Sequence, residues 1–338
     1  MAGIDYKQSG VNIDAGNEVV RRIKALARST YTPNVLSGIG AFGGLFQMDP
    51  SVTEPVLVAS ADGVGTKLKL AFMTGVHDTI GADLVNHCVN DILVQGASPL
   101  FFLDYLATGC LSPDVAEQIV KGVARACAEN GCALLGGETA EMPGFYSDGE
   151  YDVAGFIVGV VERARVIDGS RIMAGDVLIA LPSTGLHTNG YSLARAIVFD
   201  ALKLDVSSHV ADLGTTVGDA LMRTHRSYLP AIRPLLPSGA IKGMAHITGG
   251  GLTENTPRML PEGTSAEIDR TTWTVPALFS WLQRGGNIAE AEMLRAFNMG
   301  VGLVIAVAET DAASILSALP DAWRVGRVVA GARDVRYV

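Results

Sequence analysis

The sequence predicts an α+β protein made of two α+β domains. Its 338 residues exceed what one hydrophobic core usually holds. Apolar runs alternate with glycine-rich breaks, and 48% of the residues are hydrophobic while 18% are charged, which is typical of a globular chain. The strand and helix patterns do not alternate regularly enough for a TIM barrel, so we expect two separate α+β layers.

The spacing of apolar residues places the expected elements along the chain. Val19, Ile23 and Leu26 recur at helical spacing behind Asp14 and predict a first helix over 14–30. Apolar runs predict strands over 55–61, 100–107, 151–162, 176–182, 241–247 and 301–308. Helical spacing predicts further helices over 80–95, 113–130, 190–200, 215–229, 275–284 and 288–296.

A short polar passage separates the two predicted domains. It runs between Arg163 and Asp176 and contains Gly169 and Gly175. We place the boundary near residue 170. This gives an N-terminal domain over 1–170 and a C-terminal domain over 171–338.

Charge and composition exclude several classes of function. A net charge of -9 argues against nucleic acid as a partner, because binding the phosphate backbone needs a basic face. The first ten residues lack the apolar core of a signal peptide, and no apolar stretch reaches the ~20 residues that span a bilayer. We therefore expect a soluble cytoplasmic protein without a membrane partner. The cysteines form no C-x-x-C pair, and we expect buried, unpaired thiols at Cys88, Cys110, Cys127 and Cys132.

The segment 62–67, which reads DGVGTK, closes the apolar run of the first predicted strand. Its acid, glycines, hydroxyl and lysine could hold a polyphosphate and its metal ion, although the spacing is not that of a P-loop. We predict Asp62 as a metal ligand and Lys67 as a phosphate contact worth roughly 1.5 to 3 kcal/mol. The accompanying nucleotide contacts would be Gly63, Gly65 and Thr66.

Five short polar side chains share one face of the predicted helix 80–95, namely Asp83, Asn86, His87, Asn90 and Asp91. Most polar stripes face water. Here, however, no Lys, Arg or Glu occurs between residues 70 and 116, so the negative charge of the stripe has no nearby partner in sequence. Mg²⁺ prefers carboxylate oxygen. We predict Asp91 as a Mg²⁺ ligand, with Asp83 as a further candidate.

Two other glycine-rich segments are candidate parts of the same site. Gly136 and Gly137 precede Glu138, where they could let backbone amides approach an anion while Glu138 binds the metal ion. An ordinary turn is the alternative. The segment 38–44 fits G-x-G-x-x-G, but the surrounding prolines do not predict the strand and helix of a dinucleotide fold. We expect it to form a mobile lid that contacts phosphates through Gly40 and Gly43.

The second half repeats a strand, loop and helix arrangement around residues 183–190 and 246–251. Free amides at the start of each helix could hold a phosphate. The candidate contacts are Thr188, Asn189, Gly249 and Gly250. For His187 and His246, a structural hydrogen bond to backbone and a contact with substrate both remain open.

These segments together resemble the phosphoribosylformylglycinamidine cyclo-ligase family, also called aminoimidazole ribonucleotide synthetase. The motifs are DGVGTK at 62–67, VND at 89–91, GGETAEMPG at 136–144, GLHTNGYS at 185–192 and HITGGGL at 246–252. The resemblance covers nearly all of the chain, from SGVNIDAGN at 9–17 to FNMGVG at 297–302.

The resemblance implies an ATP-dependent ring closure in purine biosynthesis, in which formylglycinamidine ribonucleotide becomes aminoimidazole ribonucleotide with release of ADP and phosphate. It implies ATP and Mg²⁺, and a cytoplasmic homodimer whose N-terminal strands form a barrel between subunits. The loops at 185–190 and 248–251 would hold the ribose phosphate. The candidate catalytic residues are Lys67, Asp91, His187 and His246. A small-molecule kinase of the same superfamily and a non-catalytic nucleotide-binding subunit are the alternatives.

Overall fold

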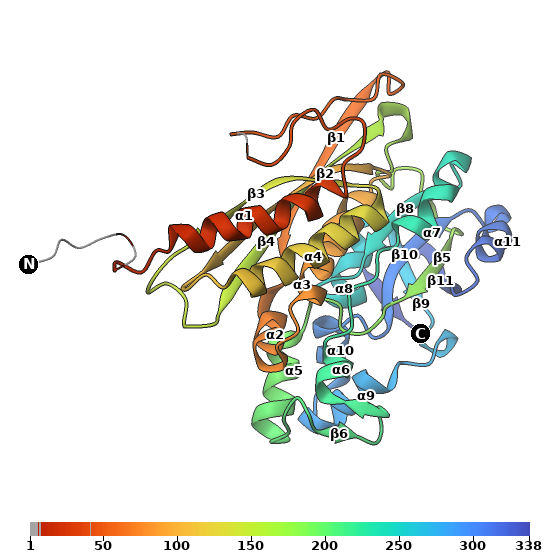
Figure 1. Ribbon diagram of the computed structural model, residues 1–338. Helices are drawn as coiled ribbons and strands as arrows, with labels where there is room; N and C mark the ends of the chain where they lie inside the picture. The colour runs from red at the N-terminus through yellow and green to blue at the C-terminus, as the bar shows by residue number, and fades with distance from the viewer. Residues whose placement is uncertain (1–5, 7, 41) are drawn as a thin grey trace, which may run out of the picture. The chain divides into compact units, whose positions relative to one another are not determined.

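The computed structural model describes residues 6, 8–40 and 42–338 and divides into two compact units. The first unit contains the chain up to residue 92 together with 98–162, and the second contains 93–97 and 163–338. The sequence places this boundary near residue 170. Each unit has its own β-sheet and its own helices, so the predicted α+β class is confirmed (Figure 1).

The sheet of the first unit has the strand order β1-β4-β2-β3. These strands are β1 (Pro55–Gly63), β4 (Tyr151–Glu162), β2 (Ser98–Thr108) and β3 (Ala133–Glu141). β4 is antiparallel to both of its neighbours, whereas β2 and β3 are parallel. A parallel pair needs a crossover connection, and helix α4 (Pro113–Asn130) supplies it.

One face of this sheet is covered by helices. α1 (Ile13–Arg28) and α4 lie side by side over it (Figure 1), and α3 (Asp78–Leu93) packs beneath α4. Glycines allow α3 and α4 to approach closely. A Cβ atom at Gly81 would lie 2.1 Å from the Ile119 carbonyl oxygen, and one at Gly122 would lie 1.9 Å from that of Asp78. The short helix α2 (Leu68–Thr74) follows a 3-10 turn over Gly65–Lys67.

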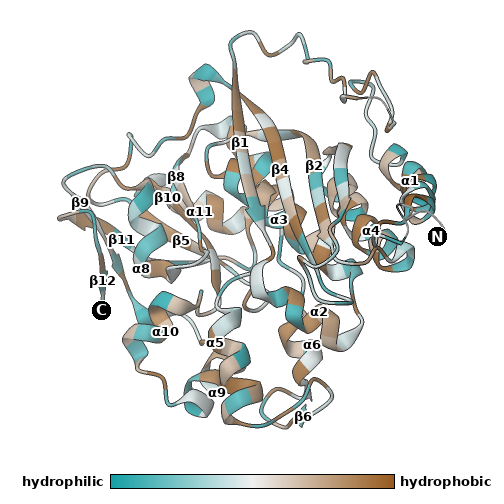
Figure 2. Ribbon diagram, turned by 90° about the vertical axis from the view of Figure 1, so that its left-hand side faces the viewer, coloured by the Kyte–Doolittle hydropathy of each residue, from teal (hydrophilic) through white to brown (hydrophobic). Residues whose placement is uncertain are grey.

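The other face of the first sheet is apolar and exposed. Leu57 on β1 is 62% exposed and Phe156 on β4 is 45% exposed. Ala59 and Ala61 of β1 share their face, because alternate residues of a strand point the same way. Figure 2 shows brown, hydrophobic stretches along β1 and β4. Near one end of the face, the Phe46 ring packs 5.5 Å from that of Phe101 on β2.

The second unit is built on a six-stranded sheet in the order β12-β9-β11-β5-β10-β8. Its members are β12 (Val335–Tyr337), β9 (Thr264–Ile268), β11 (Trp323–Ala330), β5 (Val177–Pro182), β10 (Val301–Val307) and β8 (Ile241–His246). Neighbours are antiparallel except for β12 and β9. Every residue of β10 is buried, so this strand lies at the centre of the core.

Short helices and one small ribbon complete the second unit. The ribbon pairs β6 (His209–Val210) with β7 (Thr215–Thr216). The helices are α5 (Tyr191–Arg195), which continues into a π-helical turn over Ala196–Ala201, α6 (Val217–Leu221), α7 (Leu229–Ile232), α8 (Gly251–Asn255), α9 (Ala277–Gly286), α10 (Glu290–Ala296) and α11 (Glu309–Ala318). No helix in the described part of the chain is both long and apolar enough to cross a membrane.

All six expected strands form, and most expected helices form with ends shifted by a few residues. The expected helix over 215–229 is wrong. Thr216 caps the start of α6 through a hydrogen bond from the Asp219 N–H, and α6 ends at Leu221, whose carbonyl accepts a hydrogen bond from the Tyr191 hydroxyl. The sequence did not predict β3, β9, β11, β12, α2 or α11. In β3, the paired glycines Gly136 and Gly137 look like a turn but lie within the strand.

Candidate functional site

The polar face of α3 is buried. Asp83 and Asn90 are fully buried, Asn86 and His87 nearly so, and only Asp91 keeps 27% of its side chain accessible. This confirms that the stripe is not an ordinary solvated surface. Each buried polar group then needs a partner, since an unpaired one costs roughly 1 to 3 kcal/mol. The Asn130 amide, for example, donates to Asn86 Oδ1 at 3.0 Å.

Lys67 and Asp83 form a fully buried ion pair. The distance from Lys67 Nζ to Asp83 Oδ2 is 2.7 Å, and neither side chain reaches solvent. Burial lowers the pKa of Lys67, and the neighbouring carboxylate opposes this. The predicted roles of Lys67 as a phosphate contact and catalytic residue, and of Asp83 as a metal ligand, are therefore corrected. In this structure the two charges neutralise each other and hold the turn after β1 against α3.

The other residues of this turn are placed differently from Lys67. Gly65 and Thr66 are exposed at its tip, and Gly65 has a φ of +64°, a backbone conformation that favours glycine. Gly63 still lies in β1, where a Cβ atom would come within 3.3 Å of the Val153 carbonyl oxygen. Gly65 and Thr66 thus face solvent, while Lys67 faces inward.

Asp62, His87 and Asp91 come together at the end of β1. His87 Nε2 lies 2.8 Å from Asp62 Oδ2 and 3.7 Å from Asp91 Oδ2. The Ser60 hydroxyl also donates to Asp91 Oδ2, at 3.1 Å. The predicted Asp62 and Asp91 are therefore neighbours in space. His87 had been noted only as part of the stripe, and its position four residues before Asp91 is the signal that links it to the carboxylate.

Electrostatics in this cluster favours charged carboxylates. Burial raises the pKa of Asp62, but the hydrogen bond and positive charge of His87 outweigh it, so the pKa lies below its ordinary value. Burial lowers the pKa of His87, but the carboxylates of Asp62 and Asp91 raise it by more. The pKa of His87 therefore lies above its ordinary value. Two ionised carboxylates, both partly accessible, form a site suited to a hard cation.

Glu138 does not join this cluster within one chain. Asp62, Gly155, Asp104 and Gly137 form one row across the sheet from β1 to β3, so β1 and β3 lie three strand spacings apart, about 14 Å. Glu138 follows Gly137 and so points to the opposite, helix-free face. The expected set of Asp62, Asp91 and Glu138 is therefore not assembled in a single chain.

Gly137 serves a different purpose from the expected one. A Cβ atom there would lie 2.3 Å from Asp104 Oδ1, so glycine makes room for this carboxyl group. Gly155 flanks Asp104 on the other side. Gly136 and Gly137 both lie inside β3, and the expected phosphate loop at this place is not formed.

Asp104 is a partly buried acid for which the sequence predicted no role. Its partners across both neighbouring strands are glycines, and it shares the helix-covered face with Phe102. Burial raises the pKa of Asp104 to about 7. The signal in the sequence is weak, because a single acid in the apolar run 100–107 also fits a strand with one solvated face.

The glycine-rich segment 38–44, of which Ala41 lies outside the described residues, belongs to a hairpin-like loop. Val35 and Phe46 form a β-bridge, and a Cβ atom at Gly44 would lie 2.4 Å from Leu135 Cγ, so the base of the loop is packed on β3. Around it, residues 29–54 contain neither a helix nor a strand among those described, which excludes the dinucleotide fold. Gly40 lies beside α1, where a Cβ atom would be 3.8 Å from Lys24 Nζ. Gly43 has open space around it.

In the second unit the two predicted loops lie side by side. A Cβ atom at Gly249 would be 3.3 Å from Asn189 Oδ1. The Asn255 amide donates to the carbonyls of Gly249 at 3.0 Å and Gly251 at 2.9 Å, which fixes the loop. Gly250 has a φ of +95°, and turns of this kind can form concave anion sites from successive N–H groups.

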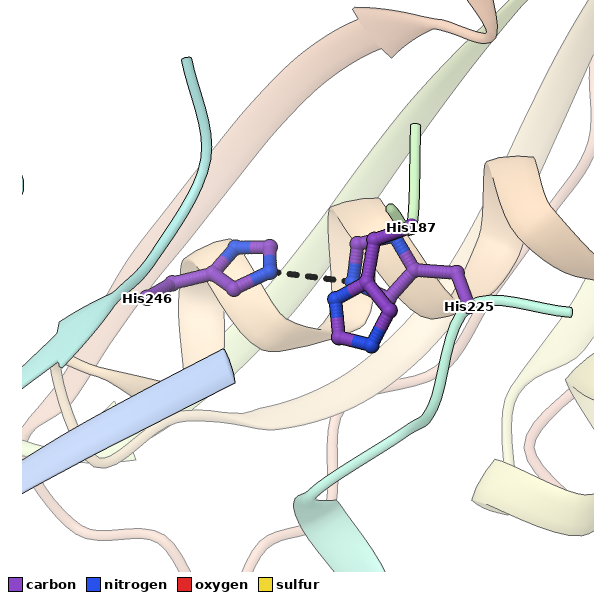
Figure 3. A group of neighbouring side chains, drawn as sticks. All are labelled: His187, His225 and His246. Carbon is purple, nitrogen blue, oxygen red and sulfur yellow. Dashed lines mark hydrogen bonds between the residues drawn. The ribbon is translucent and has the colours of Figure 1, made fainter. Parts of the chain in front are cut away.

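Next to these loops, His187, His225 and His246 form a buried cluster (Figure 3). His187 lies in the loop after β5, His225 between α6 and α7, and His246 at the end of β8. His187 and His246 were predicted site residues, and the structure brings them together through His225. No role was predicted for His225, because its sequence context is not comparable to the glycine-rich loops of His187 and His246.

Family models and individual relatives of this chain point to the same family. Residues 47–161 match the family model of the AIR synthase related protein N-terminal domain, and residues 173–338 match that of its C-terminal domain. A phosphoribosylformylglycinamidine cyclo-ligase of Trichlorobacter lovleyi is 56% identical over 96% of this chain and 94% of that protein. The protein of the same name from Desulfitobacterium hafniense is 55% identical over 99% of this chain and 100% of that protein.

Solved structures show the same fold at low identity. A thiamine-monophosphate kinase from Stenotrophomonas maltophilia has a TM-score of 0.69 at 19% identity and covers 95% of both chains. The hydrogenase maturation protein HypE in complex with ATP has a TM-score of 0.65 at 18% identity, covering 94% of this chain and 90% of that chain.

The raised pKa of Asp104 predicts a pH-dependent cost to stability. The folded state binds this proton more tightly than the unfolded state does, so ionisation destabilises the fold increasingly from about pH 4 to about pH 7. Asp104→Asn removes this cost. We expect the variant to gain stability relative to the parent as pH rises, by up to about 4 kcal/mol at pH 8. Urea unfolding of both proteins at pH 5 and pH 8 measures this.

The matched control for Asp104 is Asp152→Asn, which changes an exposed carboxylate on the adjacent strand β4. Its effect on the free energy of unfolding should be nearly the same at both pH values. An Asp104→Asn effect that is equally independent of pH would contradict the assignment of Asp104 as a partly buried, proton-binding acid.

Proposed function

The chain belongs to the AIR synthase related family, and on this premise we propose how its residues carry out the family's cyclo-ligase reaction. The reaction is the ATP-dependent cyclisation of formylglycinamidine ribonucleotide to aminoimidazole ribonucleotide in purine biosynthesis, with release of ADP and phosphate. The observation that carries this function is the identity of 56% and 55% to cyclo-ligases along nearly the full chain. It favours the ligase over the kinase and over a subunit without chemistry.

The proposed ATP and metal site is the cluster of Asp62, His87 and Asp91. Its partly accessible carboxylates and the lowered pKa of Asp62 fit Mg²⁺, which prefers carboxylate oxygen. When bound, Mg²⁺ neutralises charge on the transferring phosphoryl group. His87 holds Asp62 in place by a hydrogen bond, and Ser60 does the same for Asp91. Gly65 and Thr66, exposed at the tip of the turn after β1, are the proposed nucleotide contacts.

The proposed substrate-phosphate site is the pair of loops at 185–190 and 248–251. Thr188, Asn189, Gly249 and Gly250 lie in these adjacent loops, and Asn255 fixes one of them from behind. A rigid set of donors binds a phosphate without a large entropic cost. His187 and His246 are the proposed substrate contacts beside the loops. The segment 38–44, with Gly40 and Gly43, stays a proposed lid over the nucleotide.

In this reaction the protein mainly positions the reacting groups and accepts protons. ATP phosphorylates the formyl amide oxygen, which turns that oxygen into a phosphate leaving group. The neighbouring nitrogen then attacks the activated carbon, loses its proton, and phosphate departs. Holding the reacting groups in place can supply much of the rate enhancement. A buried imidazole can accept the proton.

The exposed apolar sheet face supports a homodimer. Leu57, Phe156 and their neighbours would be covered by the same face of a second copy, as in the intersubunit barrel that the sequence resemblance implies. Glu138 points to this face, so in a dimer its carboxylate lies at the interface and not in the cluster of its own chain. We place the protein in the cytoplasm, because its four cysteines are all free thiols.

Replacing Asp91 tests the metal role. Asp91→Asn keeps the shape of the side chain but removes a charged ligand, so we expect kcat to fall roughly 100-fold or more while the melting temperature stays near that of the parent. Asp114→Asn, on the first turn of α4 and 82% exposed, is the control and should keep its activity. Steady-state ADP release measures both. Near-normal turnover of Asp91→Asn at saturating Mg²⁺ would refute the metal role.

Replacing Phe156 tests the dimer. Phe156→Asp places a charge in the proposed apolar interface, where burial without a partner is unfavourable. We expect the parent to have the mass of a dimer by light scattering and the variant that of a monomer at the same micromolar concentration. Met173→Asp alters a side chain of the second unit that is also exposed, at 60%, and should leave the mass unchanged. A monomeric parent, or a dimeric Phe156→Asp protein, would disprove the interface.

A further inference from the structure

The turn between α10 and β10 contacts both proposed phosphate loops of the second unit. It runs over residues 297–300, all of which are buried. Figure 2 shows α10 between α8 and α5, the helices that follow the two loops. The proposed function assigns no role to this turn, although it lies against the part of the chain that is proposed to bind the substrate phosphate.

Asn298 joins this turn to the start of the first loop. It is 4% exposed, and its amide nitrogen donates to the Gly185 carbonyl at 2.8 Å. Its Oδ1 accepts from the Ser183 hydroxyl and from the Gly300 N–H, both at 2.9 Å. The Ser183 N–H in turn donates to the Gly300 carbonyl at 2.9 Å. A side chain with both a donor and an acceptor is needed here, and an amide supplies both.

Phe297 packs against the last residue of each loop. A Cβ atom at Gly190 would lie 2.5 Å from Phe297 Cε1, and one at Gly251 would lie 2.8 Å from the Phe297 carbonyl oxygen. Gly190 has a φ of +77° and Gly251 a φ of +60°, conformations that glycine adopts without strain. Both loops therefore pack on the same residue, next to the one that clamps the first loop.

The turn itself has a fixed conformation. Met299 and Gly300 both have a positive φ, at +52° and +93°, and the Val301 N–H closes the turn by donating to the Asn298 carbonyl at 2.9 Å. The Trp273 indole N–H donates to the Met299 carbonyl at 3.1 Å. A residue other than glycine keeps such a conformation only where its surroundings hold it. The turn can therefore serve as a rigid support.

A common support fixes the distance between the two loops. They meet at Gly249, where a Cβ atom would lie 3.3 Å from Asn189 Oδ1. The terminal oxygens of one phosphate can contact both loops only if this separation is kept. Holding donors in place before the ligand arrives removes the entropic cost of ordering them on binding.

We propose that Asn298 is a positioning residue for a phosphate monoester bound between the loops 185–190 and 248–251. It holds the first loop, through Gly185 and Ser183, at the distance from the second at which one phosphate contacts both. This rests on the proposed function, which places the ribose phosphate at these loops. It deepens that function by naming the residue that keeps the two loops in register.

The direct test is the affinity of full-length Asn298→Ala protein for ribose 5-phosphate. The backbone amide signals of Asn189 and Gly250 report binding at each loop, and in the parent we expect both to shift with one Kd. In Asn298→Ala we expect the Kd to rise roughly 10-fold or more, because the bonds that hold the first loop are lost. The titrations are run well below the melting temperature of the variant, so that only folded protein is compared.

Kinetics and a control provide further readouts. We expect Asn298→Ala to raise KM for the phosphate-bearing substrate roughly 10-fold while KM for ATP stays within roughly 2-fold of the parent value. Asn287→Ala, which alters an exposed asparagine at the end of α9 in the same unit, is the control and should bind ribose 5-phosphate as the parent does. If Asn298→Ala does not fold, Ser183→Ala decides by the same titration. It removes one bond to Asn298, and we expect its Kd to rise roughly 3-fold.

The outcomes separate the inference from the function beneath it. If the parent binds ribose 5-phosphate at both loops and the deciding variant binds it equally well, Asn298 only stabilises the fold, the positioning role is wrong and the phosphate site stands. If neither amide of the parent responds to ribose 5-phosphate, the proposed phosphate site fails and the positioning role fails with it.

Discussion

The ion pair between Lys67 and Asp83 is the interaction on which the site of the first unit depends. Lys67 ends the turn that follows β1, and Asp83 lies one helical turn before His87 on α3. The pair therefore fixes the strand that carries Asp62 against the helix that carries His87 and Asp91. Breaking a fully buried pair by removing one partner costs about 3 to 5 kcal/mol, because the other charge stays buried without compensation. The ion pair thus positions the cluster of Asp62, His87 and Asp91 without needing to contact a ligand itself.

This dependence explains why residues of one motif have different tasks. Within 62–67, Asp62 faces His87, Gly65 and Thr66 form the exposed tip, and Lys67 turns inward to Asp83. In the second unit, Asn255 and Gly302 have supporting tasks of the same kind, since one fixes a loop and the other makes room for His187 and Tyr228. In both units, buried polar partners hold the residues proposed to meet substrate.

The fold class and half of the candidate site were predictable from the sequence, for physical reasons. Helical spacing and the lack of Lys, Arg and Glu predicted that the stripe on α3 is not solvated, and Asp62 and Asp91 do meet. Sequence spacing could not show that Lys67 would be buried, because lysine is ordinarily exposed. It also could not place Glu138, since the order of strands in the sheet, with β4 between β1 and β2, is set by tertiary pairing. His225 could not be linked to the site, because it lies outside the glycine-rich loops and reaches His246 and Thr188 only through the tertiary fold.

The central claim is that Asp62 and Asp91 hold the metal ion that accompanies ATP. Anomalous diffraction from crystals grown with Mn²⁺ and a non-hydrolysable ATP analogue tests it most directly, because the signal locates the ion without assumptions about activity. The account predicts an anomalous peak within coordination distance of carboxylate oxygens from both Asp62 and Asp91, with Lys67 still paired to Asp83. A Mn²⁺ ion bound elsewhere while these two carboxylates remain unligated would contradict it.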